Sequence, residues 1–253
     1  MSAEFPARQY RFPPITEAVV EFRFASPISR DEQDQISSKS AKYYPNLSEI
    51  SNRHFHIEVD KGTAEVTETT TNLRRTNADE NEIFLITPQS FNISQLPLYE
   101  GWVAFRQRFQ RDWEIAKSIL GYRKLERLGI RFINRLDFPF EDDLVHPAKY
   151  LNVYINHPTQ YGVMQSSAIQ TRYFVEDLNA NMTIQSATVE SPLPKHLGIL
   201  LDIDIGREDD VPQKDDDIFT YFEQVRLFKN QVFEASITDA TRERFSSDLR
   251  LGS

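Results

Sequence analysis

The sequence of 253 residues contains no cysteine and only 8 glycines. Without cysteine the chain has no disulfide, no thiolate nucleophile and no cysteine-based zinc site. Glycine-rich phosphate loops are missing too, because neither GxGxxG nor GxxxxGK[ST] occurs. The hydrolase motifs HExxH and GxSxG are also absent from the sequence. No motif points to a cofactor, and we expect none.

Long apolar runs are also lacking, and none approaches the roughly 18 residues that a membrane-spanning helix needs. The N-terminus, MSAEFPARQYRF, lacks the apolar segment of a signal peptide. We therefore expect a cytoplasmic protein without membrane contact, and the lack of disulfides fits that compartment. The net charge of −9 disfavours nucleic acid as a partner, since phosphates repel an acidic surface.

What is present is a regular alternation of strand and helix patterns. Period-two alternation predicts eight strands, at residues 17–24, 54–59, 63–75, 82–95, 127–138, 162–175, 182–190 and 197–205. Helical spacing and capping signals predict helices at residues 29–42, 102–120, 147–155, 215–232 and from Thr238 onward, and Asp60-Lys61-Gly62 predicts a tight turn. The predicted apolar stripe of the helix at 102–120 consists of Trp102, Phe105, Phe109, Trp113, Ala116 and Leu120, and that of the helix at 215–232 of Ile218, Tyr221, Phe222, Val225, Phe228 and Val232. The helix at 29–42 begins with a capping box, Ser29 and Glu32, and is expected to lie on the surface because it is polar.

This order repeats once along the chain. Residues 1–121 and residues 122–253 each read as strand, helix, three strands and long helix. We infer an α+β fold of two tandem β-α-β-β-β-α units that pack intimately into one structural unit. The predicted sheet is curved and mainly antiparallel, and two long helices cover one of its faces. Its other face is then available to a ligand.

The stretch RLGIRFINRLDFP, residues 127–139, has an unusual pattern for a buried strand. Its apolar side carries Asn134 among four apolar residues, which are Ile130, Phe132, Leu136 and Phe138. Its other side carries Ile133 and three charged residues, which are Arg131, Arg135 and Asp137. Because successive side chains of a strand point to opposite faces, two arginines and an aspartate lie together on one face, where uncharged polar residues would have been sufficient.

Two further strands have charged sides of the same kind. The strand LLDIDIG, residues 200–206, alternates apolar residues with Asp202 and Asp204, and the first strand carries Glu21 and Arg23 on one face. If these strands are neighbours, their charged side chains share a surface. The candidate site therefore consists of Arg23, Arg131, Arg135, Asp137, Asp202 and Asp204.

Three interpretations of this surface are open. The simplest is a network of cross-strand salt bridges on an exposed face, each contributing a few tenths of a kcal/mol. The second is a groove for a protein partner or a small anionic ligand, in which arginine forks bind a carboxylate or phosphate. The third is a catalytic site in which Asp202, Asp204 and Asp137 hold a divalent metal. His54 and His56 also lie two apart on one strand, but no third ligand is evident, so an exposed strand face is the commoner explanation and no metal is expected.

Several motifs together resemble a known family. They are PPITEAVVEFRF at residues 13–24, YEGW at 99–102, RLGIRFINRLDFP at 127–139, LLDIDI at 200–205 and FEASITDATRERF at 233–245. In that order they resemble a sporadically distributed family of uncharacterised bacterial proteins of about this length. The resemblance implies a bacterial accessory gene, such as one in a defence or toxin-antitoxin locus. It implies no activity and no catalytic residue.

The sequence thus favours a non-enzymatic interaction or ligand-binding module whose surface is the charged strand face. The alternative is a metal-dependent hydrolase or nuclease that uses Asp202 and Asp204. A third possibility is a homo-oligomeric scaffold, because the edge strands of an open sheet invite self-pairing.

Overall fold

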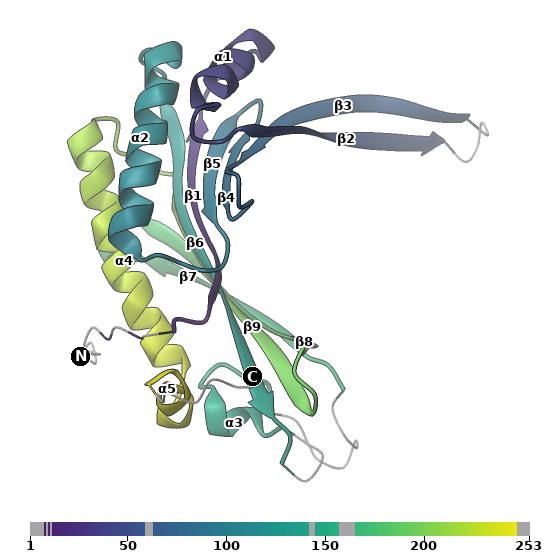
Figure 1. Cartoon of the computed structure of the whole chain (residues 1–253), viewed down its shortest axis with the longest axis vertical. Helices are drawn as coiled ribbons and strands as arrows, with labels where there is room; N and C mark the ends of the chain where they lie inside the picture. The colour runs from purple at the N-terminus through teal and green to yellow at the C-terminus, as the bar shows by residue number, and fades with distance from the viewer. Residues whose placement is uncertain are drawn as a thin grey trace. The chain divides into compact units, whose positions relative to one another are not determined.

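The structure is a computed structural model that describes residues 8, 10, 12–58, 63–141, 145–156 and 165–246, without the side chains of 52–58, 63–70 and 246. It is a mixed α/β protein with one large antiparallel sheet and, among the described residues, five α-helices (Figure 1). The described strands follow the order β2-β3-β4-β5-β1-β6-β9-β8-β7 across the sheet. The α+β class and the antiparallel sheet predicted from the sequence are confirmed.

The nine strands are β1 (Ile15–Phe24), β2 (Asn46–Glu58), β3 (Thr63–Thr76), β4 (Glu82–Ile86), β5 (Ser90–Gln95), β6 (Leu125–Pro139), β7 (Ala168–Val175), β8 (Ala180–Glu190) and β9 (His196–Arg207). The helices are α1 (Arg30–Ser40), α2 (Trp102–Leu120), α3 (Pro147–Tyr150), α4 (Asp215–Ser236) and α5 (Asp239–Ser246). A 3₁₀ turn, Glu176–Leu178, joins β7 to β8. No helix of the described residues is both long enough and apolar enough to cross a bilayer.

Contacts divide the chain into two compact units. Unit 1 consists of Met1–Ala18 with Gly129–Ser253, and unit 2 consists of Val19–Leu128. The sequence pattern had suggested a division after residue 121. The long strands β1 and β6 each contribute residues to both units, so a division by contacts falls inside these strands rather than in the loop after α2.

The core of unit 2 is aromatic and is built around α2. All six residues of the predicted apolar stripe of this helix are buried, namely Trp102, Phe105, Phe109, Trp113, Ala116 and Leu120. The ring of Trp113 stacks on Phe22 of β1 with 4.9 Å between centroids, and Phe22 stacks in turn on Phe91 of β5 at 4.8 Å. Stacked rings of this kind bury large apolar areas and fix the helix against the strands.

Two predictions for unit 2 were wrong in detail. Residues 82–95 form two strands, β4 and β5, rather than one, because Thr87 and Ser90 close a tight turn through the bond from the Thr87 N–H to the Ser90 carbonyl (2.8 Å). Helix α1 is not a purely surface helix, since it buries Gln33, Ile36, Ser37 and Ser40. Its predicted capping box, Ser29 and Glu32, is confirmed.

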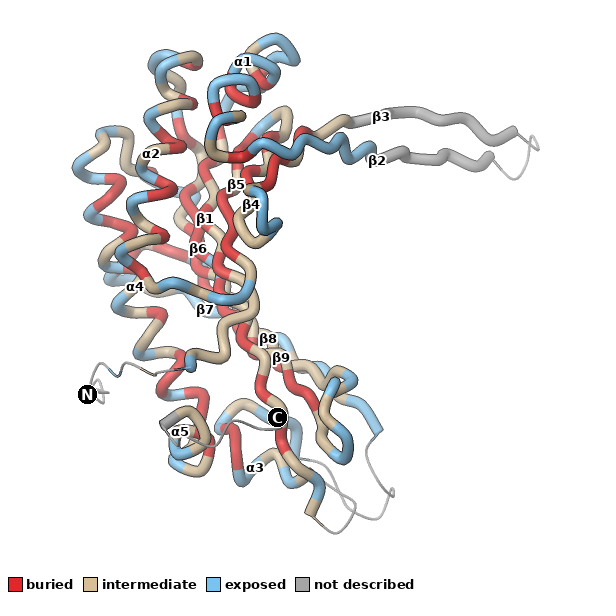
Figure 2. The backbone as a smooth tube through the Cα atoms, viewed as in Figure 1, coloured by how far each residue is buried: buried red, intermediate tan, exposed pale blue. Residues whose placement is uncertain are grey.

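In unit 1 the predicted apolar faces of β6 and β9 are confirmed. The four apolar residues of β6 and the three of β9, Leu201, Ile203 and Ile205, are each at most 1 % exposed, and Asn134 is also buried. Figure 2 shows the resulting alternation of buried and less buried residues along β6. Side chains on the other face of β6 therefore remain accessible to solvent.

The helices of unit 1 differ from their predictions. Helix α3 ends at Tyr150 instead of residue 155, and Tyr150 stacks on Phe138 of β6 at 4.1 Å. In α4 the buried stripe passes from Val225 to Lys229 and Phe233, whereas the sequence had suggested Phe228 and Val232. After Val225 the buried residues follow in steps of four, which slightly exceed the 3.6 residues of a helical turn, so the buried stripe moves round the helix away from Phe228 and Val232.

Three predictions lie outside the described residues. They concern the tight turn at residues 60–62, the start of the predicted strand at 162–164 and the side chains of His54 and His56.

Candidate functional site

Strands β6 and β9 are neighbours in the sheet, as the sequence interpretation required. Their adjacency brings Arg131 of β6 onto Asp202 of β9. The Arg131 Nε donates to both Asp202 oxygens at 2.9 and 3.0 Å, and the Nη2 donates to Oδ2 at 2.6 Å. This is a fork in which one guanidinium edge holds a whole carboxylate. The Arg131 side chain nevertheless stays 49 % exposed, whereas Asp202 is 14 % exposed.

Carboxylates outnumber arginines around this fork. The hydrogen bonds that Arg131 donates to Asp202 raise the pKa of Arg131, and the charges of Asp202, Asp204 and Glu17 also raise it. Because three negative groups act on one guanidinium, Arg131 stays protonated and its charge is compensated locally. A free anion approaching Arg131 would therefore meet more negative than positive charge.

The second arginine of the face, Arg135, is anchored at the far end of the same strands. Its Nε lies 3.1 Å from Asp137 Oδ2, two residues along β6, and its Nη2 donates to the Glu190 carbonyl of β8. Arg131 and Arg135 are thus both fixed by carboxylates, but each by a different one. We call the surface formed by Arg131, Arg135, Asp137, Asp202 and Asp204 the open face.

The position of Arg135 depends on the small residue beside it. A Cβ added to Gly198 of β9 would come within 2.9 Å of Val189 Cγ2, 3.0 Å of the Val189 carbonyl oxygen and 3.2 Å of Arg135 Nη2. The carbonyl belongs to the backbone of the paired strand β8 and cannot move aside cheaply.

We therefore predict that Gly198→Ala lowers the free energy of unfolding by about 1 to 3 kcal/mol, as overpacking does. Where a strand has room for a side chain, replacing glycine by alanine raises the free energy of unfolding instead, because alanine has fewer conformations in the unfolded chain. Urea denaturation of the two proteins measures the difference. An unchanged or higher unfolding free energy would show that the site has room for the methyl group.

The structure does not bring Arg23 into the open face. Arg23 belongs to unit 2, and its Nε lies 3.1 Å from Glu126 Oε1 at the start of β6. Next to it Arg127 forms an ion pair with Glu21. These two pairs are half-buried cross-strand salt bridges of β1 and β6, which is the simplest of the three interpretations offered by the sequence.

The geometry gives the metal-site interpretation no support. Within the described residues, no group of three or more His, Asp or Glu side chains is placed to hold a metal ion. Asp202 already accepts three hydrogen bonds from Arg131, so a cation at this carboxylate would have to displace a guanidinium.

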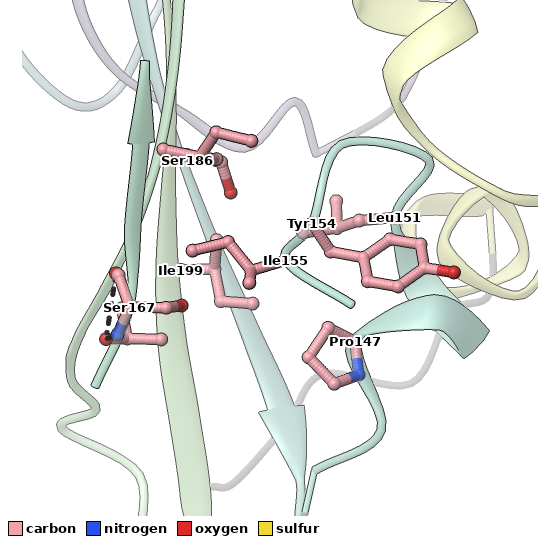
Figure 3. A pocket seen from close by; sticks show the side chains of 9 residues that line it. Pro147, Leu151, Tyr154, Ile155, Ser167, Ser186 and Ile199 are labelled. Atoms are coloured by element: carbon pink, nitrogen blue, oxygen red, sulfur yellow. Dashed lines mark hydrogen bonds between the residues drawn. The ribbon is translucent and has the colours of Figure 1, made fainter. Parts of the chain in front are cut away.

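Unit 1 also contains a small hollow between strand residues and the segment 147–155 (Figure 3). Ser186 and Ile199 come from the strands, and Pro147, Leu151 and Tyr154 form the opposite wall. Every lining side chain is uncharged, namely Pro147, Leu151, Tyr154, Ile155, Ser167, Ile169, Ser186, Thr188 and Ile199. The hollow therefore offers a ligand no charged side chain.

Sequence reasoning missed two groups of polar residues in the interior. Lys229 of α4 is 7 % exposed, with its Nζ 3.8 Å from the centroid of the Phe132 ring. In unit 2, Asp112 of α2 is fully buried and accepts hydrogen bonds from Tyr44 and Arg111. A signal existed for both, since Lys229 is four residues after Val225 and Asp112 is three after Phe109, at positions next to the apolar stripes.

Comparison with known proteins adds little. No family model matches the sequence, and no curated protein matches it. Among solved structures, the S. pombe Pct1 RNA triphosphatase in complex with the Spt5 CTD is similar over 90 % of this chain and 86 % of that chain, at 10 % identity and a TM-score of 0.15. A TM-score that low is no sign of a shared fold, and nothing about this chain follows from it.

Proposed function

We propose that the protein is a non-enzymatic interaction module and that the open face of unit 1 is its binding surface. The observation that carries this proposal is the Arg131–Asp202 fork, which is ordered by three hydrogen bonds while half of the arginine side chain remains exposed. A charge that is fixed in place loses little conformational entropy when a partner binds to it.

A protein surface fits the open face better than a small anion does. Arg131 is surrounded by Asp202, Asp204 and Glu17, and Arg135 is paired with Asp137. Positive and negative groups at fixed positions require a complementary arrangement of charges on the partner. Such complementarity increases the specificity of binding more than its affinity. The accessory role implied by the family resemblance, a cytoplasmic location and an origin of the two halves by duplication belong to this proposal as well.

The strand order supports the duplication. Reading outward from β1 the neighbours are β5, β4, β3 and β2, and reading outward from β6 they are β9, β8 and β7. In both directions the strand that precedes the long helix lies next to the first strand of its half. The first half contains one strand more, because residues 82–95 fold as a hairpin.

The test is quantitative capture from cells of the source organism with tagged protein as bait, comparing wild type with the double variant Arg131→Gln, Arg135→Gln. We expect the amount of the specific partner to fall at least about tenfold, as for the loss of two ordered charges at an interface. The matched control is Arg30→Gln, because Arg30 forms a similarly exposed ion pair (2.6 Å to Glu49) in unit 2. Equal capture by the double variant, with an unchanged circular dichroism spectrum, would refute the open face as the binding surface.

A further inference from the structure

Strand β7 is the edge of the sheet in the described part of unit 1, since β8 is its one neighbour there. The hydrogen-bond register shows which backbone groups of β7 face outward. The Thr188 N–H of β8 donates at 2.9 Å to the carbonyl of Ser167, the residue before β7, and Ala168 is paired with Ala187. Because hydrogen-bonded pairs alternate along an antiparallel ladder, the odd-numbered residues of β7 bond to β8.

The even-numbered residues of β7 therefore direct their backbone N–H and carbonyl groups away from β8. These residues are Gln170, Arg172 and Phe174, paired with Gln185, Thr183 and Asn181. A row of outward backbone groups of this kind is a template for a further strand. Natural edge strands are usually protected by proline, by several charges or by a bulge, whereas β7, with the sequence AIQTRYFV, has no proline, one charge and a regular register.

The side chains of β7 match the composition of protein interfaces. Arg172, Tyr173 and Phe174 are consecutive exposed residues, and the two aromatic residues are 49 % and 59 % exposed. Arginine and aromatic residues are the types most enriched at interface hot spots. Among the described residues Arg172 has no ion pair and no side-chain hydrogen bond, unlike Arg131 and Arg135.

We propose that β7 is a docking strand to which an extended acidic segment of another protein adds as a further strand. The segment would bond to the outward backbone groups of Gln170, Arg172 and Phe174, place a carboxylate opposite Arg172 and lay an apolar side chain against Phe174. This is the strand-addition mode of peptide recognition, in which the main chain supplies affinity and alternate side chains supply specificity. The inference rests on the proposed function in taking the protein as an interaction module, but it uses groups outside the open face.

Charge decides the kind of segment that fits. The nearest acidic residue in the row of Arg172 is Asp204, which is paired with Thr183 and thus lies two strands away, at roughly 10 Å. Within the described residues no carboxylate forms an ion pair with Arg172, and the overall charge of −9 is screened beyond about 8 Å at physiological salt. A second copy of the chain fits less well, because its β7 has no acidic residue and would add a second Arg172 to the interface.

The test uses fluorescence anisotropy with two labelled eight-residue peptides, one alternating Val and Glu and the other alternating Val and Lys. We expect wild type to prefer the Glu peptide by about tenfold, and Arg172→Glu to reverse this preference. Gln170→Pro removes one outward N–H without touching a bond to β8 and should abolish binding. Gln170→Ala keeps that N–H and is the matched control, which should bind like wild type.

Each other outcome counts against the proposal. It is overturned if wild type binds neither peptide, if it binds both equally, or if Gln170→Pro binds as well as Gln170→Ala. Sedimentation of the same proteins tests whether a second copy of the chain binds β7 instead. A wild-type dimer that becomes monomeric on Gln170→Pro would mean that it does. The double variant Arg131→Gln, Arg135→Gln should bind the Glu peptide normally, so failure of the open face and failure of β7 remain distinguishable.

Discussion

Replacing Lys229 by methionine should raise the free energy of unfolding at pH 7 by about 2 to 3 kcal/mol. Lys229 is buried between α4 and β6, and no carboxylate of the described residues pairs with its ammonium. Burial, together with the smaller effect of the nearby charge of Arg226, lowers the pKa of Lys229 to about 7. Folding a lysine with such a pKa costs about 4 kcal/mol at pH 7, of which the contact with Phe132 recovers about 1 to 2 kcal/mol.

The same group makes stability depend on pH with a defined sign. The folded-state pKa of Lys229 is below its unfolded value, so between these two values the unfolded chain binds more protons than the folded one. Stability must then increase as the pH rises from about 7 toward 10. Above pH 10 the tyrosines Tyr10 and Tyr44, whose pKa values are raised by burial, begin to oppose this trend, since they ionise first in the unfolded chain.

Urea denaturation at pH 7 and pH 9 measures both effects in one experiment. Wild type should be more stable at pH 9, and Lys229→Met should lose most of that difference. Lys124→Met is the control, because Lys124 is exposed in unit 2 and its removal should change neither the stability nor its pH dependence. If Lys229→Met is less stable than wild type at pH 7, the aliphatic part of the lysine and its contact with Phe132 outweigh the cost of burying the charge.

Replacing Asp112 by alanine should lower the free energy of unfolding by about 3 to 5 kcal/mol, the range for breaking a buried ion pair. The Asp112 side chain is fully buried, with its Oδ2 2.6 Å from the Tyr44 hydroxyl and its Oδ1 2.8 Å from the Arg111 Nε. Arg111 Nη2 also donates to the Tyr44 hydroxyl at 2.9 Å, which closes the three groups into a ring. Removal of the carboxylate leaves a half-buried guanidinium and a buried hydroxyl without their acceptor.

The control for this variant is Asp34→Ala. Asp34 also forms an ion pair with an arginine, at 3.2 Å to Arg30, but it is 52 % exposed, so its removal should cost less than about 1 kcal/mol. A double-mutant cycle with Tyr44→Phe separates the hydroxyl from the guanidinium. A cost for Asp112→Ala no larger than that for Asp34→Ala would show that water replaces the lost carboxylate and that the ring does not hold α2 in place.

Much of this architecture follows from local sequence patterns. The stripe of α2 and the alternation of β6 and β9 predicted which of their side chains are buried, because a helix or a strand with one apolar face has one way to bury it. The Ser29 capping box was also predicted correctly, since its hydrogen bonds join residues three apart. Patterns failed where a short turn decided the structure, as at Thr87, where a continuous strand pattern folds as a hairpin.

The candidate site was predicted in part. The sequence identified the charged faces of β6 and β9, but whether they meet depended on strand order, which only long-range pairing decides. That pairing joined Arg131 to Asp202 and left Arg23 with Glu126 in unit 2. It also placed β7 at an edge of the described sheet, which is the basis of the role proposed for Arg172, an arginine that the sequence pattern did not distinguish.

By itself, then, the sequence determined the class of fold and the buried faces of α2, β6 and β9, because these depend on residues a few positions apart. Only the tertiary structure decided which charges are paired, which strand is left at the edge and that Lys229 and Asp112 are enclosed. The physical reason is that ion pairing, edge exposure and desolvation depend on neighbours distant in sequence, such as Phe132 beside Lys229 and Tyr44 beside Asp112.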